Sequence, residues 1–292
     1  MNPFFTTQVF DPIRIPLDRW IADFVNWLSF NYRPTFQAMK RPIEVILQSV
    51  DGILQAVPPV AFIVILALLA WRVAGWKVGL FTAAAMTMVG MIGMWTPTMT
   101  TLSMVLAAVL VCVVIGVPLG ILAARSDRFA GGLRPVLDVM QTTPAFVYLV
   151  PVVMLFSIGT VAGVIATIIF ALPPLIRLTN LGIRGVPEDV VEAAEAFGSS
   201  EGEILVKVRL PLALPTIMAG VNQTIMLALS MVVIAAMIGA AGLGVPVVEG
   251  LNALRIGVAG IGGVAIVLLA IVLDRITQAV GEGGRNGRAG SS

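Results

Sequence analysis

The sequence predicts an all-α integral membrane protein, and its composition and the arrangement of its apolar residues carry that prediction. Of the 292 residues, 58% are hydrophobic and only 12% are charged, and the mean hydropathy is +1.00, whereas soluble domains carry about 25% charged residues. No charged side chain occurs in the runs 78–95, 101–124 and 144–176. Because a charge near the centre of a membrane helix costs about 2.5–3.5 kcal/mol, these runs should insert readily.

Apolar runs long enough to approach the roughly 30 Å of a bilayer core predict about seven transmembrane helices. The fourth and fifth are short and are separated only by the region from Ser157 to Thr160, so six or eight spans are also compatible with the pattern. The predicted spans are 53–71, 78–95, 101–124, 144–158, 159–176, 212–238 and 256–273.

The two ends of the chain differ from the transmembrane domain, which we place at 53–280. In the tail 1–52, three aromatic residues recur at helical spacing opposite polar ones, which predicts an amphipathic helix lying in the membrane interface. A partner-facing or poorly ordered tail is the alternative. The aromatic residues are Trp20, Phe24 and Trp27, and the polar ones are Asp18, Asp23 and Asn26. The glycine-rich segment 281–292 predicts a flexible end.

Several kinds of chemistry are excluded by what the sequence lacks. It has no His and a single Cys112, so it cannot assemble a Cys/His metal site or a disulfide framework. A net charge of +2 gives no indication of nucleic-acid binding. The chain also has no GxxxxGK[ST] phosphate loop, and its three lysines are isolated. We therefore expect no cofactor in this chain, and any ATP and Mg²⁺ must be bound by a partner subunit.

The basic residues predict an orientation. Twelve of the eighteen Lys and Arg residues lie in the loops 72–77, 125–143 and 177–211 and in the tail after Asp274, whereas the alternate loops 96–100 and 239–255 hold only Arg255. The positive-inside rule places the first set in the cytoplasm of a bacterial cell. With seven spans, the N-terminus is then outside and the C-terminus inside, in a multi-pass protein of the cytoplasmic (inner) membrane.

The loop 184–211 has the signals of two short helices joined by a glycine. Pro187 suits a first helical position, Gly198 suits the left-handed residue that ends a helix, and Ser200 with Glu203 forms a capping-box pattern before a stop at Pro211. In the first helix, three glutamates share one face while Val190, Ala194 and Phe197 line another. On periodicity alone, this elbow is equally compatible with an ordinary helical hairpin packed on the membrane domain.

The spacing of residues in the elbow resembles the EAA loop of ABC importer permeases, which docks on a cytoplasmic ATPase. The resemblance implies a type I importer permease fold and an ATPase-coupling role for the matching positions. Val208 stands where that pattern usually has Ile, a conservative difference. The positions are Glu192, Ala193, Ala194, Phe197, Gly198, Val208, Leu210 and Pro211.

A wider resemblance covers about residues 102–280. The stretches QTTPAFVYLVP (141–151), RLTNLGIRGVP (177–187) and MAGVNQTIMLALSMVVIAAMI (218–238) resemble the permeases of glycine betaine/proline betaine importers and their choline-type relatives. This resemblance implies ATP-driven uptake of a quaternary or methylated amine by two copies of this chain, two ATPase subunits and an external solute-binding protein.

Polar side chains within the spans are the candidates for a solute path, although such groups commonly only hydrogen-bond neighbouring helices. They are Tyr148, Asn222, Gln223, Thr224 and Ser230. The main rival function is a secondary carrier or channel for a small neutral or zwitterionic solute. Since the spans from 78 onward contain no ionisable side chain before Asp274 and Arg275, proton coupling is disfavoured, and sodium coupling or a passive channel stays open. A membrane scaffold protein is a third possibility.

Overall fold

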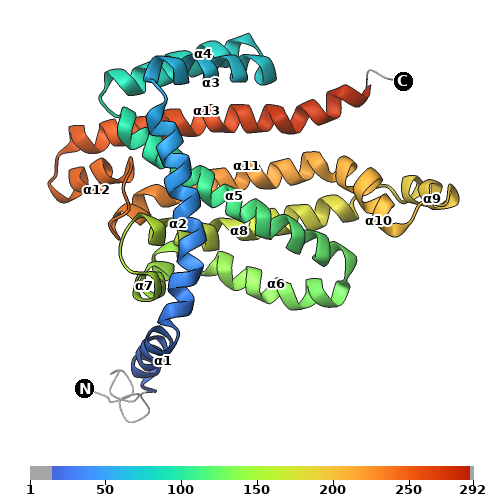
Figure 1. Ribbon diagram of the computed structural model, residues 1–292, viewed down its shortest axis with the longest axis horizontal. Helices are drawn as coiled ribbons and strands as arrows, with labels where there is room; N and C mark the ends of the chain where they lie inside the picture. The colour runs from blue at the N-terminus through green and yellow to red at the C-terminus, as the bar shows by residue number, and fades with distance from the viewer. Residues whose placement is uncertain (1–14, 290–292) are drawn as a thin grey trace, which may run out of the picture.

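The computed structural model describes residues 15–289, with side chains described as far as Gly281, and the residues it describes form helices and short connections. Four long helices, α5 (Trp95–Arg125), α8 (Thr160–Arg184), α11 (Leu210–Ala236) and α13 (Ile256–Ala289), run side by side (Figure 1). Short helices α9 (Glu188–Ala196) and α10 (Glu201–Glu203) lie at one end of this bundle, and α12 (Gly244–Asn252) lies at the other. We call these the elbow end and the α12 end.

Small residues allow the central helices to pack closely. A Cβ atom on Gly120 of α5 would lie 2.5 Å from the Cβ of Thr179 on α8, and one on Gly220 of α11 would lie 3.2 Å from the side chain of Leu175. Helices in a membrane associate through such close van der Waals packing, since lipid gives no hydrophobic drive for helix–helix contact. Helix α8 is therefore held between α5 and α11, with Leu175 fully buried.

The span prediction agrees with the structure for the long helices and not for the others. Among the described residues, four helices are long and apolar enough to cross a membrane, and six spans result if each of two bent pairs counts as one. The four are Trp95–Arg125, Thr160–Arg184, Glu201–Ala236 and Ile256–Gly281. The predicted number of seven is therefore not confirmed.

The first predicted span, 53–71, is wrong as a single helix. Helix α2 (Arg33–Ala56) and helix α3 (Pro59–Ala74) meet at a bend of 105°. Pro58 and Pro59 cause the break, because proline disfavours helical conformation in the residue before it and lacks the N–H that a continuing helix needs. Helix α4 (Trp76–Met91) then returns beside α3, and the turn between them carries Arg72 and Lys77 in or next to it.

Helix α2 falls in the region that the sequence analysis treated as a tail, and it crosses the bundle rather than running along it (Figure 1). Leu47 is buried in the core, and Ser103 of α5 donates a hydrogen bond of 2.9 Å to the carboxylate of Asp51. The predicted amphipathic helix is present as α1 (Leu17–Asn31), and none of its residues is buried. Residues 1–14 of the predicted tail lie outside the described residues.

The predicted loop 125–143 is also a helix. Helix α6 (Asp127–Thr142) is capped by Ser126, whose hydroxyl accepts a hydrogen bond from the Phe129 amide at 3.3 Å, and the helix turns back beside the bundle. Helix α7 (Ala145–Phe156) follows at a bend of 101° and has only 12 residues, so the predicted span 144–158 is too short to cross a bilayer alone. The bend falls at Thr143–Pro144, where proline again disfavours a continuous helix.

The last helix is longer than predicted. Helix α13 continues from the predicted end at 273 to Ala289, so the predicted flexible segment 281–292 overlaps its last turns. Residues 290–292 lie outside the described residues.

Candidate functional site

The elbow is a short helix, a left-handed glycine and a second helix, as the sequence predicts. Helix α9 ends where Gly198 takes φ +82°, with its amide donating to the Glu195 carbonyl at 2.8 Å and the Ser199 amide donating to the Ala194 carbonyl at 3.1 Å. A left-handed residue closed by such hydrogen bonds is a common helix ending, and glycine adopts it without steric cost. The chain therefore reverses at Gly198 with little strain.

The predicted capping box starts the second helix. The Ser200 hydroxyl accepts from the Glu203 amide at 3.4 Å, and the Glu203 carboxylate accepts from the Ser200 amide at 3.1 Å. Glu203 also receives the Lys207 ammonium at 2.8 Å. The hydrogen bond from Lys207, followed by those from Ser200, lowers the pKa of Glu203 to about 2, so its carboxylate stays ionised at neutral pH.

The predicted stop at Pro211 is wrong. A π-helical segment, η3 (Ile204–Arg209), joins α10 directly to α11, which begins at Leu210. Pro211 is the second residue of α11, just after the π-helical segment, and the helix continues through it. The elbow is consequently continuous with the long apolar helix α11.

Helix α9 is anchored on a different face from the one its periodicity suggests. Val191 is buried, whereas Val190 is exposed and Phe197, at the tip, is 92% exposed. An exposed phenylalanine beside a rigid turn has no packing role within this chain. The tip of the elbow therefore presents an apolar side chain outward.

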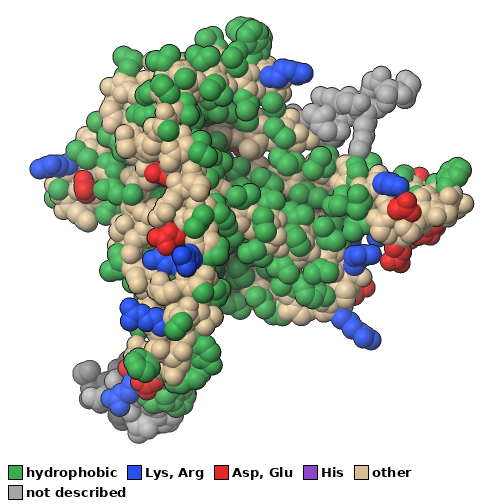
Figure 2. Space-filling view, viewed as in Figure 1, with side chains coloured by type: hydrophobic (Ala, Val, Ile, Leu, Met, Phe, Trp, Pro, Cys, Tyr) green, Lys and Arg blue, Asp and Glu red, His purple; other side chains and the backbone are tan. Residues whose placement is uncertain are grey.

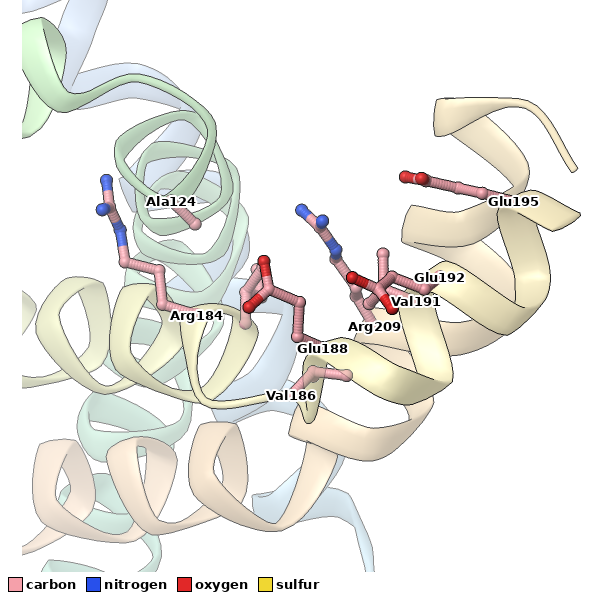
Figure 3. A pocket seen from close by; sticks show the side chains of 9 residues that line it. Ala124, Arg184, Val186, Glu188, Val191, Glu192, Glu195 and Arg209 are labelled. Atoms are coloured by element: carbon pink, nitrogen blue, oxygen red, sulfur yellow. The ribbon is translucent and has the colours of Figure 1, made fainter.

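A hollow of about 490 Å³ lies between α9 and the elbow ends of α5, α8 and η3 (Figure 3). Three glutamates of α9 and two arginines line it, and the labelled side chains lie around its opening. The charged residues are Glu188, Glu192, Glu195, Arg184 and Arg209. The face of α9 that borders the hollow is thus acidic.

Arg184 fixes the base of this hollow. Its guanidinium contacts the Asp127 carboxylate at 2.7 Å and donates to the Ala123 carbonyl at 2.8 Å and to the Asn180 side chain at 2.9 Å. Arg125 lies 3.6 Å from Glu201 across the elbow. The contacts of Arg184 tie the end of α8 to α5 and α6, and the Arg125–Glu201 ion pair links α10 to α5. No local pattern in the sequence indicates this role of Arg184, since the role depends on α6 being a helix.

The structure separates the five candidate path residues. Thr224 is fully buried and donates to the Gly220 carbonyl at 2.9 Å and the Ala171 carbonyl at 3.2 Å, so it joins α11 to α8. The Tyr148 hydroxyl donates to the carbonyls of Val139 and Met140 at the corner between α6 and α7. Both hydroxyls have local partners within the helix packing.

Asn222 is hydrogen-bonded to α13 and also borders a hollow of about 330 Å³ between α11 and α13. Its amide donates to the Asp274 carboxylate at 3.0 Å, and its oxygen accepts from the Thr277 hydroxyl. Sequence reasoning missed this network, although Asp274 as a lone acid near the end of a span was a signal of it.

Gln223 and Ser230 remain on an exposed stripe that runs along α11. The Ser230 hydroxyl donates to the Met226 carbonyl of its own helix at 2.9 Å. In Figure 2, hydrophobic side chains cover the middle of the molecule and charged ones gather toward the elbow end and along the crossing N-terminal helices. Of the predicted path residues, these two stay available to a solute or to another chain.

Among the described residues, no group of three or more His, Cys, Asp or Glu residues could hold a metal ion. The charged clusters of the elbow are ion pairs and an acidic face, and they contain no nucleophile and base positioned on one another. The arrangement suits docking more than catalysis.

Comparison with known proteins identifies the class. Residues 116–283 match the family described as "Binding-protein-dependent transport system inner membrane component", which is more than half of the chain, so this protein belongs to that family of importer permeases. The fold agrees: the methionine ABC transporter MetNI, solved in inward-facing conformations, has a chain that superimposes with a TM-score of 0.56 at 23% identity, over 63% of this chain and 92% of that one.

Within this family the chain is similar to permeases for betaines. It is 54% identical over 286 residues to the glycine betaine/proline betaine transport system permease protein ProW of Escherichia coli (strain K12), covering 98% of this chain and 79% of ProW. It is 46% identical over 265 residues to the glycine betaine transport system permease protein OpuAB of Bacillus subtilis (strain 168), covering 91% of this chain and 94% of OpuAB. The protein is accordingly an inner-membrane permease of the ABC type, and the similarity supports no carrier or channel.

Proposed function

We propose that this chain moves glycine betaine, proline betaine, choline or a related quaternary or methylated amine into the cell, driven by ATP. The names of ProW and OpuAB support the substrate class, because identities of 54% and 46% extend over nearly the whole chain. An external solute-binding protein delivers the solute, and a partner ATPase binds ATP and Mg²⁺. Two copies of this chain with two ATPase subunits form the complex.

The structure of the elbow is the observation that supports coupling of transport to ATP hydrolysis through this part of the chain. A buried Val191 anchors α9, an exposed Phe197 projects from its tip, and an acidic face lies alongside. This pattern fits a knob that enters an apolar hole on the ATPase, with Glu192 and its neighbours facing basic residues at the rim. Since η3 runs straight into α11, a displacement of the elbow reaches a membrane-spanning helix without a flexible joint.

The solute path is proposed along the exposed stripe of α11, with Gln223 and Ser230 as its polar groups. A quaternary ammonium has no N–H to donate, so it needs little from the path beyond weak polar contacts. Transport also requires weak intermediate binding. The facing wall is a second copy of this chain.

Reconstitution tests the function. The permease, its ATPase and its binding protein are placed in proteoliposomes, and uptake of labelled glycine betaine is measured with and without ATP. We expect uptake that needs all three components and that persists when ionophores collapse every ion gradient. Uptake that follows an ion gradient and ignores ATP would contradict the proposal and favour a secondary carrier.

The coupling role has its own test. Phe197→Ala removes an exposed ring, so the free energy of unfolding should change by less than about 0.5 kcal/mol, while ATPase copurification and transport should fall several-fold. Glu192→Lys should act in the same way by reversing the charge of the docking face. Val190→Ala, on the same helix but away from the tip, is the control and should copurify normally. Normal ATPase binding by Phe197→Ala would remove the tip from the interface.

A further inference from the structure

The seam between α11 and α13 changes character along its length. In its middle it is apolar: Ile225, Leu229 and Val232 of α11 are buried in one cluster with Ala265 and Leu269 of α13. Van der Waals packing holds the two helices together here, and hydrogen bonds between fixed partners would add direction to the contact.

Toward the elbow end, a polar network supplies that direction. Asn222 donates to Asp274 at 3.0 Å and accepts from Thr277, so each helix both donates to and accepts from the other. Gln278 donates to the same Asp274 oxygen at 2.7 Å from its own helix. Among the side chains that the structure describes, two hydrogen bonds link α11 with α13, those of Asn222 with Asp274 and with Thr277, and we call this pair of bonds the α11–α13 joint.

The joint lies between two parts of the molecule. On one side, α11 is continuous with the elbow, and Asn222 is twelve residues beyond Leu210. On the other side, α13 holds the α3–α4 hairpin through a separate buried cluster, in which Val272 and Ile276 pack on Ala70 and Ala85. Along α13, Asp274 and Thr277 therefore each lie within one turn of Val272 or Ile276, the residues that pack on the hairpin.

We propose that the α11–α13 joint is a positioning device that makes α13, and with it the α3–α4 hairpin, follow α11 when the elbow moves. Asn222 is then a positioning residue of the transport cycle and not a part of the solute path. The inference rests on the proposed coupling of the elbow to an ATPase. It extends that coupling from α11, which is continuous with the elbow, to α13 and the α3–α4 hairpin.

Exchanging the two partners tests the joint. Asn222→Asp places two carboxylates face to face and should break the joint. The double variant Asn222→Asp/Asp274→Asn puts the amide on α13 and the carboxylate on α11, where it can accept from that amide and from Thr277. We expect the single variant to lose at least fivefold in solute transported per ATP hydrolysed, at normal abundance and with an unchanged apparent KM for solute, and the double variant to recover most of the loss.

Gln278→Leu is the matched control, because it removes a hydrogen bond to Asp274 within α13 and leaves both bonds to α11. Its transport per ATP should stay within twofold of the unaltered protein. Asn222→Leu gives a second way of opening the joint if Asn222→Asp is poorly produced, and the same loss of transport per ATP is expected.

The outcomes separate the joint from its alternatives. A residue that only stabilises the fold would lower abundance, with transport per ATP unchanged in the protein that remains, and that result overturns the proposal. A path residue would change the KM for solute and would not be rescued by a change at Asp274, which also overturns it. If the unaltered complex itself shows no ATP-dependent uptake, the proposed function fails before the joint is tested.

Discussion

Two adjacent residues at the tip of the elbow have opposite requirements. Gly198 needs a conformation that side chains avoid, at φ +82°, whereas Phe197 needs only to be exposed. A Cβ on Gly198 would meet no atom within 4 Å, so any substitution there acts through the backbone alone. Substitutions at Gly198 therefore test the backbone shape of the elbow, and substitutions at Phe197 test the side chain at its tip.

Gly198→Val should misplace α9 without unfolding the protein. A left-handed conformation costs a β-branched residue about 1–2 kcal/mol, which is small beside the insertion energy of several apolar helices. We expect ATP-driven transport to fall at least several-fold while membrane abundance stays near normal, measured by uptake and by immunoblotting of membranes.

Gly202→Val is the control for this prediction. Gly202 also has open space around a new Cβ, but it lies in α10 with ordinary helical geometry. Transport by this variant should stay within twofold of normal. Equal losses at the two glycines would mean that the left-handed turn has no special part in coupling.

At the scale of elements, the sequence predicts best where local signals act alone. The cores of the long helices, the capping box at Ser200 and the left-handed Gly198 are all found where the pattern places them. The capping box and the glycine turn depend on a few neighbouring residues, and the helix cores depend on the apolar character of a run. None of the three requires knowledge of the rest of the fold.

The elements that sequence reasoning missed depend on tertiary contacts. Helix α6 carries the charges of a loop, yet it packs beside α8, and the Arg177 guanidinium reaches Asp138 at 2.6 Å. Helix α2 is polar on much of its surface, but Leu47 and Asp51 contact α5. For the site, local pattern indicated the elbow, whereas the partners of Asn222 and Thr224 come from helices about fifty residues away.

The orientation of these elements is testable with single cysteines in a Cys112→Ala background. We expect Ala196→Cys, exposed on the elbow, to react with a membrane-impermeant maleimide only from the cytoplasmic side. Ser49→Cys, exposed on α2, should react only from outside, as the predicted outward placement of the N-terminal region requires. Reaction of both from one side would contradict the predicted placement of the N-terminal region.

At the scale of the whole molecule, the chain is poorly equipped to hold a quaternary ammonium tightly. Such cations are usually enclosed by aromatic faces, whereas the five Trp residues lie in the N-terminal helices or at span ends and Tyr148 is held in the α6–α7 corner. The two exposed polar residues of α11, Gln223 and Ser230, carry no charge. Selectivity should therefore reside mainly in the external binding protein.

Calorimetry checks this division of labour. We expect the purified permease alone to bind glycine betaine with a Kd above about 1 mM, equivalent to less than about 4.1 kcal/mol, and the binding protein alone to bind it at least a hundredfold more tightly. Micromolar binding to the permease with none to the partner would place selectivity in this chain.

Helices α3 and α4 have a consequence for the lipid around the protein. Each has 16 residues, so each is about 24 Å long, some 6 Å less than an average hydrocarbon core. Neither helix is long enough to cross an average core alone, and hydrophobic mismatch of this kind, which costs fractions of a kcal/mol per Å, is relieved when the bilayer thins. Because α13 carries this hairpin, we expect uptake in proteoliposomes to rise roughly twofold as phosphatidylcholine acyl chains shorten from 20 to about 16 carbons. The thickness of the membrane would then itself control the rate of transport.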